Sequence, residues 1–127
     1  DLYAEVTAAD GREMAAVTKR FTFNAAQEEH HGRDWDCFVT VRGYIDPTTG
    51  MVTDIGELDR LVDDKVIKPF DKQDLRQLLG PDLLRGEALA KTIWDRLAGN
   101  LSGGTLQNIR LVPSRDLAYE VSASSSF

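Results

Sequence analysis

The chain has 127 residues, of which 42% are hydrophobic and 28% are charged, and its formal net charge at pH 7 is −6. This length and apolar content suit one folded domain and exclude general disorder. The acidic balance, without a cluster of Lys and Arg, argues against a nucleic-acid partner because duplex binding needs concentrated positive charge. No apolar run approaches the roughly 20 residues that span a bilayer, so we expect no membrane contact and a cytoplasmic location.

Cys37 is the single cysteine of the sequence. A single cysteine excludes an internal disulfide and any zinc site built from several cysteines. Because Cys37 lies in an apolar stretch, packing is the more common role for it, while a nucleophilic role would need a stabilised thiolate.

Two strands are predicted in the first half of the chain. The stretch 13–26 is rich in β-branched and aromatic residues and leads into a polar segment. The stretch 34–46 alternates apolar and polar residues, which is the pattern of a strand with one buried face. Phe38 and Tyr44 lie on its otherwise polar face, so we expect helices or another subunit to cover part of that face.

The middle of the chain predicts helices and the end predicts two more strands. An apolar stripe with three-and-four spacing starts at Ile55, after a capping box of Asp54 and Glu57, and stops at Pro69. The other expected elements are a turn at 46–50, a loop with a short helical turn at 70–79, a break at 80–81, a helix at about 85–101, strands at 105–112 and 117–122, and a turn at 113–116.

The resulting order, β-β-α-α-β-β, predicts an α+β fold with a four-stranded antiparallel sheet and two helices on one face. We expect a single domain over 1–121 and a flexible, serine-rich tail at 122–127. Such a sheet has exposed edges, and exposed edges favour pairing with another subunit. A homo-oligomer is therefore expected.

Five segments between Phe21 and Glu120 carry the most distinctive motifs. They are FNAAQ at 23–27, HGRDW at 31–35, VTVRG at 39–43 continuing as DPTTGMVTD at 46–54, PFDKQDL at 69–75, and GEALA at 86–90. Together they resemble the motifs of the 6-pyruvoyl and 6-carboxy tetrahydropterin synthase family, which include Phe-Ser-Ala-Ala-His, His-Gly-His-Asn-Tyr, Leu-Asp-His-x-x-Leu and Pro-Thr-x-Glu-Asn. The resemblance implies a tunnelling fold, in which the sheets of three subunits form a barrel, two such rings can stack, and sites lie at subunit interfaces.

The resemblance also shows where this sequence departs from the family. The three positions that hold a catalytic zinc in the family correspond to Gln27, His31 and Arg33. An amide, one imidazole and a permanent cation do not form a zinc site, and Arg33 would repel the ion. We therefore predict no metal and no other cofactor.

Other functional positions of the family have changed as well. The catalytic cysteine has no counterpart, since Cys37 falls inside the following strand. The Asp-His pair of the family reads Asp71-Lys72, and its pterin-anchoring glutamate aligns with Pro113. Glu87 alone keeps its family identity, so pterin binding is not expected.

These replacements still predict a densely charged pocket. Arg33 can hold a carboxylate or phosphate by two parallel hydrogen bonds, and Asp71 beside Lys72 or His31 can transfer protons. We therefore predict a metal-free lyase, cyclase or isomerase that acts on an anionic small molecule in specialised (natural-product) metabolism. The predicted catalytic residues are Asp71, His31 and Lys72, and the predicted substrate-binding residues are Arg33, Gln27, Glu87 and Trp35.

Two alternatives stay open. One is a non-catalytic ligand-binding or scaffold homologue, in which the charged residues form interface ion pairs, His31 is structural and Trp35 belongs to the core. The other is a genuine pterin or deazapurine synthase with altered zinc ligands. The small-molecule partner and the assembly as a trimer or hexamer are common to the enzymatic interpretations.

Overall fold

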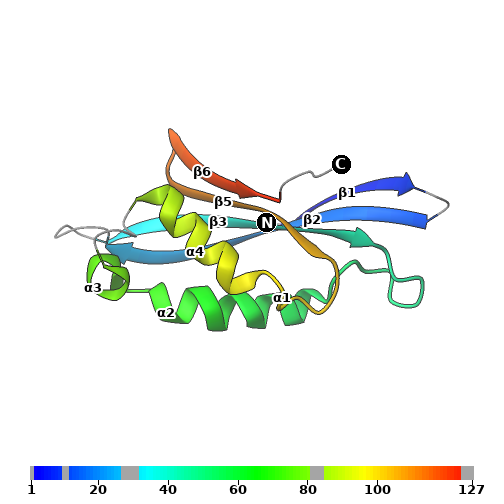
Figure 1. Ribbon diagram of the computed structural model, residues 1–127, viewed down its shortest axis with the longest axis horizontal. Coiled ribbons are helices and arrows are strands. Elements are labelled where there is room, and N and C mark those ends of the chain that lie inside the picture. The colour runs from blue at the N-terminus through cyan, green and yellow to red at the C-terminus, as the bar shows by residue number, and fades with distance from the viewer. Residues whose placement is uncertain (1, 10–11, 27–31, 81–84, 124–127) are drawn as a thin grey trace.

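The computed structural model describes residues 2–9, 12–26, 32–80 and 85–123, which form one largely antiparallel sheet with its helices on one face (Figure 1). The strands are β1 (Leu2–Ala9), β2 (Arg12–Ala26), β3 (Arg33–Tyr44), β4 (Gln73–Asp74), β5 (Thr105–Ser114) and β6 (Leu117–Ser122). The helical segments are α1 (Ile55–Val62), the π-helical η1 (Asp63–Ile67), α2 (Lys68–Phe70), α3 (Leu75–Leu79) and α4 (Gly86–Leu97). The strand order is β1-β2-β3-β5-β6, and β4 adds a short parallel pairing to β2.

β3 is the central strand, and the alternation predicted from its sequence is confirmed. Trp35, Cys37, Val39 and Val41 are all fully buried, while the residues between them are more exposed. The apolar stripes of the helical layer are buried with them, namely Leu58, Val62 and Val66 from the first helical run and Leu89, Ile93 and Leu97 from α4. Each such side chain contributes roughly 1.5–3 kcal/mol by leaving water.

The first helical run begins where the sequence predicts. The carboxylate of Asp54 accepts a hydrogen bond from the backbone N–H of Glu57 at 3.1 Å, as an N-cap does. The run continues through α1, η1 and α2 and ends one residue beyond the stop expected at Pro69. Its π-helical middle was not indicated by the apolar spacing. No helix of the described ranges is long and apolar enough to cross a membrane.

The sheet has one long strand more than the four predicted. β1 pairs with the first half of β2, from Leu2 opposite Lys19 to Ala9 opposite Arg12. The sequence did not predict it because this segment is rich in alanine, which has a weak strand propensity. The order of the other long elements is confirmed, and the loop expected at 70–79 contains the short β4 and α3.

One helix end differs from the prediction, whereas the last strand has the predicted bounds and overlaps the expected tail. α4 ends at Leu97, four residues early, because Ala98 is extended and Gly99 has a φ of 81°. β6 reaches Ser122, and the N–H of Ala123 donates to the carbonyl oxygen of Gln107 at 2.9 Å. Sheet pairing therefore continues into the first two residues of the expected tail, and 124–127 lie outside the described residues.

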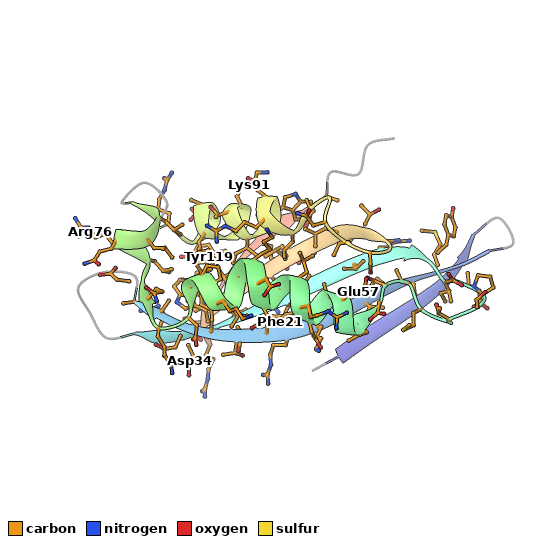
Figure 2. The ribbon with its side chains drawn as sticks, turned by 90° about the horizontal axis from the view of Figure 1, so that it is seen from below. Phe21, Asp34, Glu57, Arg76, Lys91 and Tyr119 are labelled. Carbon is orange, nitrogen blue, oxygen red and sulfur yellow. The ribbon has the colours of Figure 1, made fainter. Side chains whose placement is uncertain are left out.

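The helices lie on the face of the sheet that is nearer the viewer in Figure 2, and in the described chain they leave the other face uncovered (Figure 1). Phe38 is half-buried and Tyr44 is 42% exposed. We expected helices or another subunit to cover these rings. The helices of the described chain do not cover them. A second subunit remains the other expectation.

Candidate functional site

The candidate site lies where β2 ends, beside the start of β3 and the short β4 (Figure 1). Ala25 pairs with Arg33 of β3 on one side and with Gln73 of β4 on the other. The register therefore places residues 33–35 of one motif and the motif at 69–75 on either side of one strand. Two segments about forty residues apart in the chain are joined there through β2.

The turn at Asp71 and Lys72 is fastened to the backbone of Asn24. The N–H of Asn24 donates to Oδ1 of Asp71 at 2.8 Å, and the N–H of Lys72 donates to the carbonyl oxygen of Asn24. The N–H of Asp71 donates in turn to the carbonyl oxygen of Ile67, at 2.7 Å. Asp71 is half-buried and Lys72 is exposed, so the turn presents both side chains at the surface while its backbone is fixed.

Lys72 has a φ of 60°, and it is the one non-glycine residue of the described ranges with a positive φ. This left-handed conformation costs an L-residue about 1–2 kcal/mol. The hydrogen bonds to Asn24 hold it in place. Backbone outliers of this kind cluster at functional sites, which supports a role for this turn beyond connecting α2 to α3.

Asn24 also connects the turn to the start of β3. Its side-chain Nδ2 donates to Oδ1 of Asp34 at 2.9 Å. Gly32 approaches it so closely that a Cβ there would lie 2.2 Å from the Asn24 Oδ1. Sequence reasoning gave neither Asn24 nor Asp34 a role, and the strand register that sets them opposite each other is the signal that could have revealed the pair.

Arg33 is exposed as the first residue of β3 and makes no ion pair within the described chain. Its guanidinium is thus available for a ligand or for another subunit. Glu87 is exposed in the first turn of α4. No hydrogen bond or ion pair among the described residues joins Glu87 to Arg33, Asp71 or Lys72, so contacts do not bring Glu87 into the cluster.

Trp35 does not offer a surface to a substrate in the described chain. Its side chain is fully buried, it stacks on Phe23 with centroids 6.2 Å apart and planes at 7°, and its Nε1 donates to the carbonyl oxygen of Ala25 at 3.3 Å. The structure therefore places Trp35 in the core, which was the alternative to ligand stacking. Gln27 and His31 lie outside the described residues, and their roles stay predictions.

The described residues do not fit the zinc ion that is bound in the family whose motifs this sequence resembles. Arg33, at the third ligand position, is a permanently charged cation at the end of a strand. Among the described residues, no group of three or more His, Cys, Asp or Glu side chains is arranged to hold a metal ion. The described residues therefore offer no set of donors suited to zinc.

Cys37 is also unsuited to catalysis. It is fully buried, and desolvation by this burial raises the pKa of its thiol from 9.0 to about 12. The thiol therefore stays protonated near neutral pH. Packing, not nucleophilic attack, is the role that its surroundings support.

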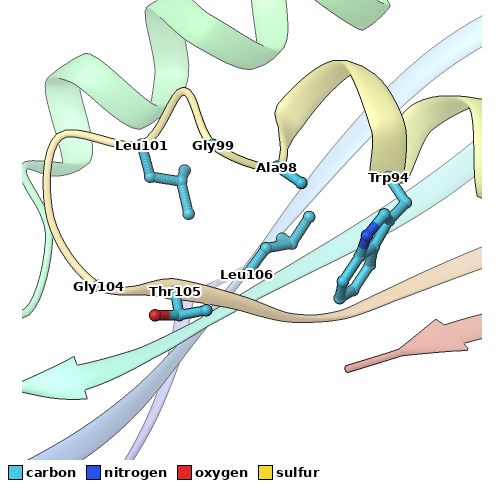
Figure 3. A pocket seen from close by; sticks show the side chains of 7 residues that line it. All are labelled: Trp94, Ala98, Gly99, Leu101, Gly104, Thr105 and Leu106. Carbon is cyan, nitrogen blue, oxygen red and sulfur yellow. The ribbon is translucent and has the colours of Figure 1, made fainter. Parts of the chain in front are cut away.

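Two cavities lie at the far end of the sheet, where β5 begins. One of about 330 Å³ is enclosed by Trp94, Ala98, Gly99, Leu101 and Leu106 with the segment Gly104–Thr105 (Figure 3). A larger one of about 750 Å³ lies on the end of β3 and shares Gly104 and Thr105 with the first. Neither is lined by Asp71, Lys72 or Arg33, of which Arg33 and Lys72 are exposed and Asp71 is half-buried in the single chain.

Comparisons with known proteins agree with the motifs. The family model described as 6-pyruvoyl tetrahydropterin synthase matches residues 15–123. The chain is 29% identical over 130 residues to the 6-pyruvoyl tetrahydrobiopterin synthase of Pongo abelii, covering 83% of this chain and 90% of the relative. It is 31% identical over 84 residues to that of Homo sapiens, covering 64% and 58%. The structure of Caenorhabditis elegans 6-pyruvoyl tetrahydropterin synthase has the same fold, with a TM-score of 0.76 at 19% identity, covering 87% of this chain and 96% of the other.

Proposed function

The chain belongs to the 6-pyruvoyl tetrahydropterin synthase family, and from this we propose that it is a metal-independent member that performs acid–base chemistry on a small anionic molecule. The observation that carries the proposal is the fixed turn of Asp71 and Lys72, which is fastened to Asn24. One strand away lies Arg33, which forms no ion pair with any described residue. A carboxylate, an ammonium and a guanidinium are thereby grouped at one end of the sheet.

Asp71 is the residue we assign to proton transfer. Within the described chain only its Oδ1 is engaged, by the N–H of Asn24, so the second oxygen is available to accept a proton from a substrate. Lys72 as an ammonium, or His31 as an imidazolium, would donate a proton of its own to another atom of the substrate, and the proton held by Asp71 would then restore that donor. Return at a different carbon is an isomerisation, and departure of a leaving group instead is a lyase reaction.

Arg33 is the residue we assign to substrate binding. A guanidinium offers two parallel N–H donors to a carboxylate or phosphate, and Arg33 has no competing carboxylate in the described ranges. It would also stabilise negative charge that develops as Asp71 removes a proton. Gln27 follows β2 directly in the sequence, and we assign it a further hydrogen bond to the substrate.

A second subunit would complete the site. Acid–base chemistry is stronger where water is excluded, and both Arg33 and Lys72 are exposed in the single chain. We propose that a neighbouring subunit, in a trimer or hexamer, closes the site and that Glu87 reaches the substrate across that interface. Exposed Glu87, without a described contact to Asp71, is consistent with this arrangement.

The test combines ligand screening with hydrogen exchange. Small carboxylates and phosphates are screened by thermal shift, and each binder is incubated with the protein in D₂O while NMR follows the loss of its C–H signals. Asp71→Asn keeps an oxygen that can accept from Asn24, so it should bind normally but exchange at least 100-fold more slowly, about the lower end of the contribution of a general base. Arg33→Gln should lose binding, whereas the control variants Arg60→Gln and Asp95→Asn on the helices should change neither.

Exchange that survives both Asp71→Asn and Arg33→Gln would overturn the assignment. Binding that depends on Arg33 without any exchange would favour the second candidate, a ligand-binding homologue. One observation favours that candidate: the bond from Asn24 to Asp71 already gives this carboxylate a structural use.

A further inference from the structure

The cavity of about 750 Å³ lies at the opposite end of the sheet from the Asp71 turn. Its volume is within the range of roughly 300–1,000 Å³ that small-molecule sites occupy. β3 leads from Arg33 to this cavity at Arg42, and nine residues of strand at about 3.3 Å each separate the two positions by about 30 Å. The cavity is therefore distinct from the proposed catalytic site.

Close-packed glycines build one wall of the cavity. A Cβ on Gly43 would lie 2.9 Å from the Cα of Gly104, and a Cβ on Gly103 would lie 2.7 Å from the carbonyl oxygen of Val52. Gly104 also has a φ of 74°, which favours glycine. Because backbone atoms, not flexible side chains, set this wall, the cavity has a defined shape before any ligand binds.

The charges around the cavity favour an anion. Arg42 is the one cation among the described residues that line it, is exposed, and makes no ion pair in the described chain. Asp46 is the one lining carboxylate, and its Oδ1 accepts from the N–H of Thr48 at 2.7 Å and of Thr49 at 3.3 Å. Asp46 is thus held in its own turn, and no carboxylate whose side chain the structure describes forms an ion pair with Arg42.

The rest of the lining is mostly apolar. Met14, Ile45 and Val52 contribute carbon surface, and the ring of Tyr44 is 42% exposed at the cavity. Thr105, which also lines the smaller cavity drawn in Figure 3, adds a hydroxyl. A cation at one side of an apolar hollow matches a molecule with one anionic end and one apolar end.

We propose that this cavity is a second ligand site, for a small monocarboxylate with an aromatic or branched apolar body. The carboxylate binds Arg42 through two parallel hydrogen bonds, and the apolar body lies against Met14, Ile45 and Val52. The site needs no second subunit and does not depend on the chemistry proposed at Asp71.

The experiment titrates the full chain with phenylacetate, 3-phenylpropionate and 4-methylpentanoate by calorimetry, up to concentrations on the order of 10 mM. The neutral amide of the best binder serves as the matched ligand control. We expect the amide to bind at least tenfold more weakly. Arg42→Gln should weaken the carboxylate by a similar factor without unfolding the chain, because Arg42 is exposed.

A second variant tests the cavity independently of its charge. Thr105→Trp places a large side chain at an exposed strand position of the lining and should also reduce binding at least tenfold. Arg60→Gln, on α1, should leave it unchanged. The proposal is overturned if none of the three carboxylates binds or if the amide binds equally well. It is also overturned if Arg42→Gln and Thr105→Trp both retain binding. Loss of binding in Arg33→Gln would overturn it as well, because that result assigns the anion to the other site.

Discussion

Arg96 lies over the ring of Phe70, with its guanidinium carbon 4.6 Å from the ring centroid. The same guanidinium donates from Nη1 to the carbonyl oxygen of Lys65 in η1, at 3.1 Å. Phe70 packs on Phe23, with centroids 5.8 Å apart, and directly precedes Asp71. One side chain of α4 thus holds both the π-helical segment and the aromatic residue that leads into the candidate site.

Removal of this guanidinium should destabilise the fold. Arg96→Met keeps the apolar stem but loses the cation–π contact and leaves the Lys65 carbonyl without this donor, so we expect the free energy of unfolding to fall by about 1–2 kcal/mol. Urea unfolding measures the change. The control is Lys91→Met, which removes an exposed ion pair to Asp95 on the same helix and should cost no more than about 0.5 kcal/mol. Equal losses in both variants would contradict the role given to Arg96.

Lys72 allows stability and function to be separated. Lys72→Gly relieves the left-handed backbone, at the cost of extra freedom in the unfolded chain, so we expect the free energy of unfolding to stay equal or rise by up to about 1 kcal/mol. Lys72→Val, with a β-branched side chain at the same φ, should instead lose about 2 kcal/mol. If Lys72 acts in proton transfer, both variants should exchange ligand hydrogens more slowly. A stable Lys72→Gly protein with unchanged exchange would remove Lys72 from the mechanism.

Zinc affinity should follow the ligand positions. We expect elemental analysis of the purified protein to find far less than one zinc per subunit, because Arg33 takes the place of a donor. The double substitution Gln27→His with Arg33→His supplies three imidazoles together with His31, and should bind about one zinc per subunit. Stoichiometric zinc in the unaltered chain would instead support a synthase with altered ligands, and native mass on the same samples would count the subunits.

Cys37 gives a pH dependence of definite sign. Its pKa is about 12 in the folded chain, against 9.0 when it is not buried. Well below pH 9 the thiol is protonated in both the folded and the unfolded chain, so it does not make the free energy of unfolding depend on pH. Between pH 9 and 12 only the unfolded chain loses the proton. Stability should therefore fall with rising pH in this window, by about 1.4 kcal/mol per pH unit at most.

The readout is the difference in the free energy of unfolding between the unaltered chain and the Cys37→Ala variant. Other groups titrate above pH 9 in both proteins, so subtracting the two unfolding free energies isolates the thiol. The alanine variant should be less stable at pH 7 because it leaves a small cavity, and the gap should narrow above pH 9. If this difference in stability stays constant from pH 8 to pH 10.5, burial does not raise the pKa of the thiol and the prediction is wrong.

The sequence predicts those parts of the fold that rest on strong periodicity or on local chemistry. The strict alternation of β3 and the cap at Asp54 are both in place because each depends on neighbouring residues. β1 was missed because its alanine-rich pattern is weak, and pairing along β2 stabilises it instead. The π-helical turns of η1 depend on packing with α4, which no local pattern encodes.

The sequence indicated which residues could form the candidate site, but it did not indicate the hydrogen bonds that join them. Motif resemblance selected Asp71, Lys72 and Arg33, and the strand register sets their segments on either side of β2. The part of Asn24 could not be foreseen, since it acts through its backbone N–H and carbonyl groups, which every residue carries. The sequence left Trp35 between ligand stacking and the core, because alternation shows which face a residue lies on but not whether a ligand reaches that face.

The burial of Cys37 gives this protein an internal probe of its own opening. A thiol reagent meets no other cysteine in the sequence, and it reaches this one only in molecules whose central strand has separated from the helices. The rate of labelling in native buffer, compared with that of the denatured chain, therefore measures the free energy of that separation without any denaturant present. Ligands for either end of the sheet can be ranked by how much they slow the same reaction.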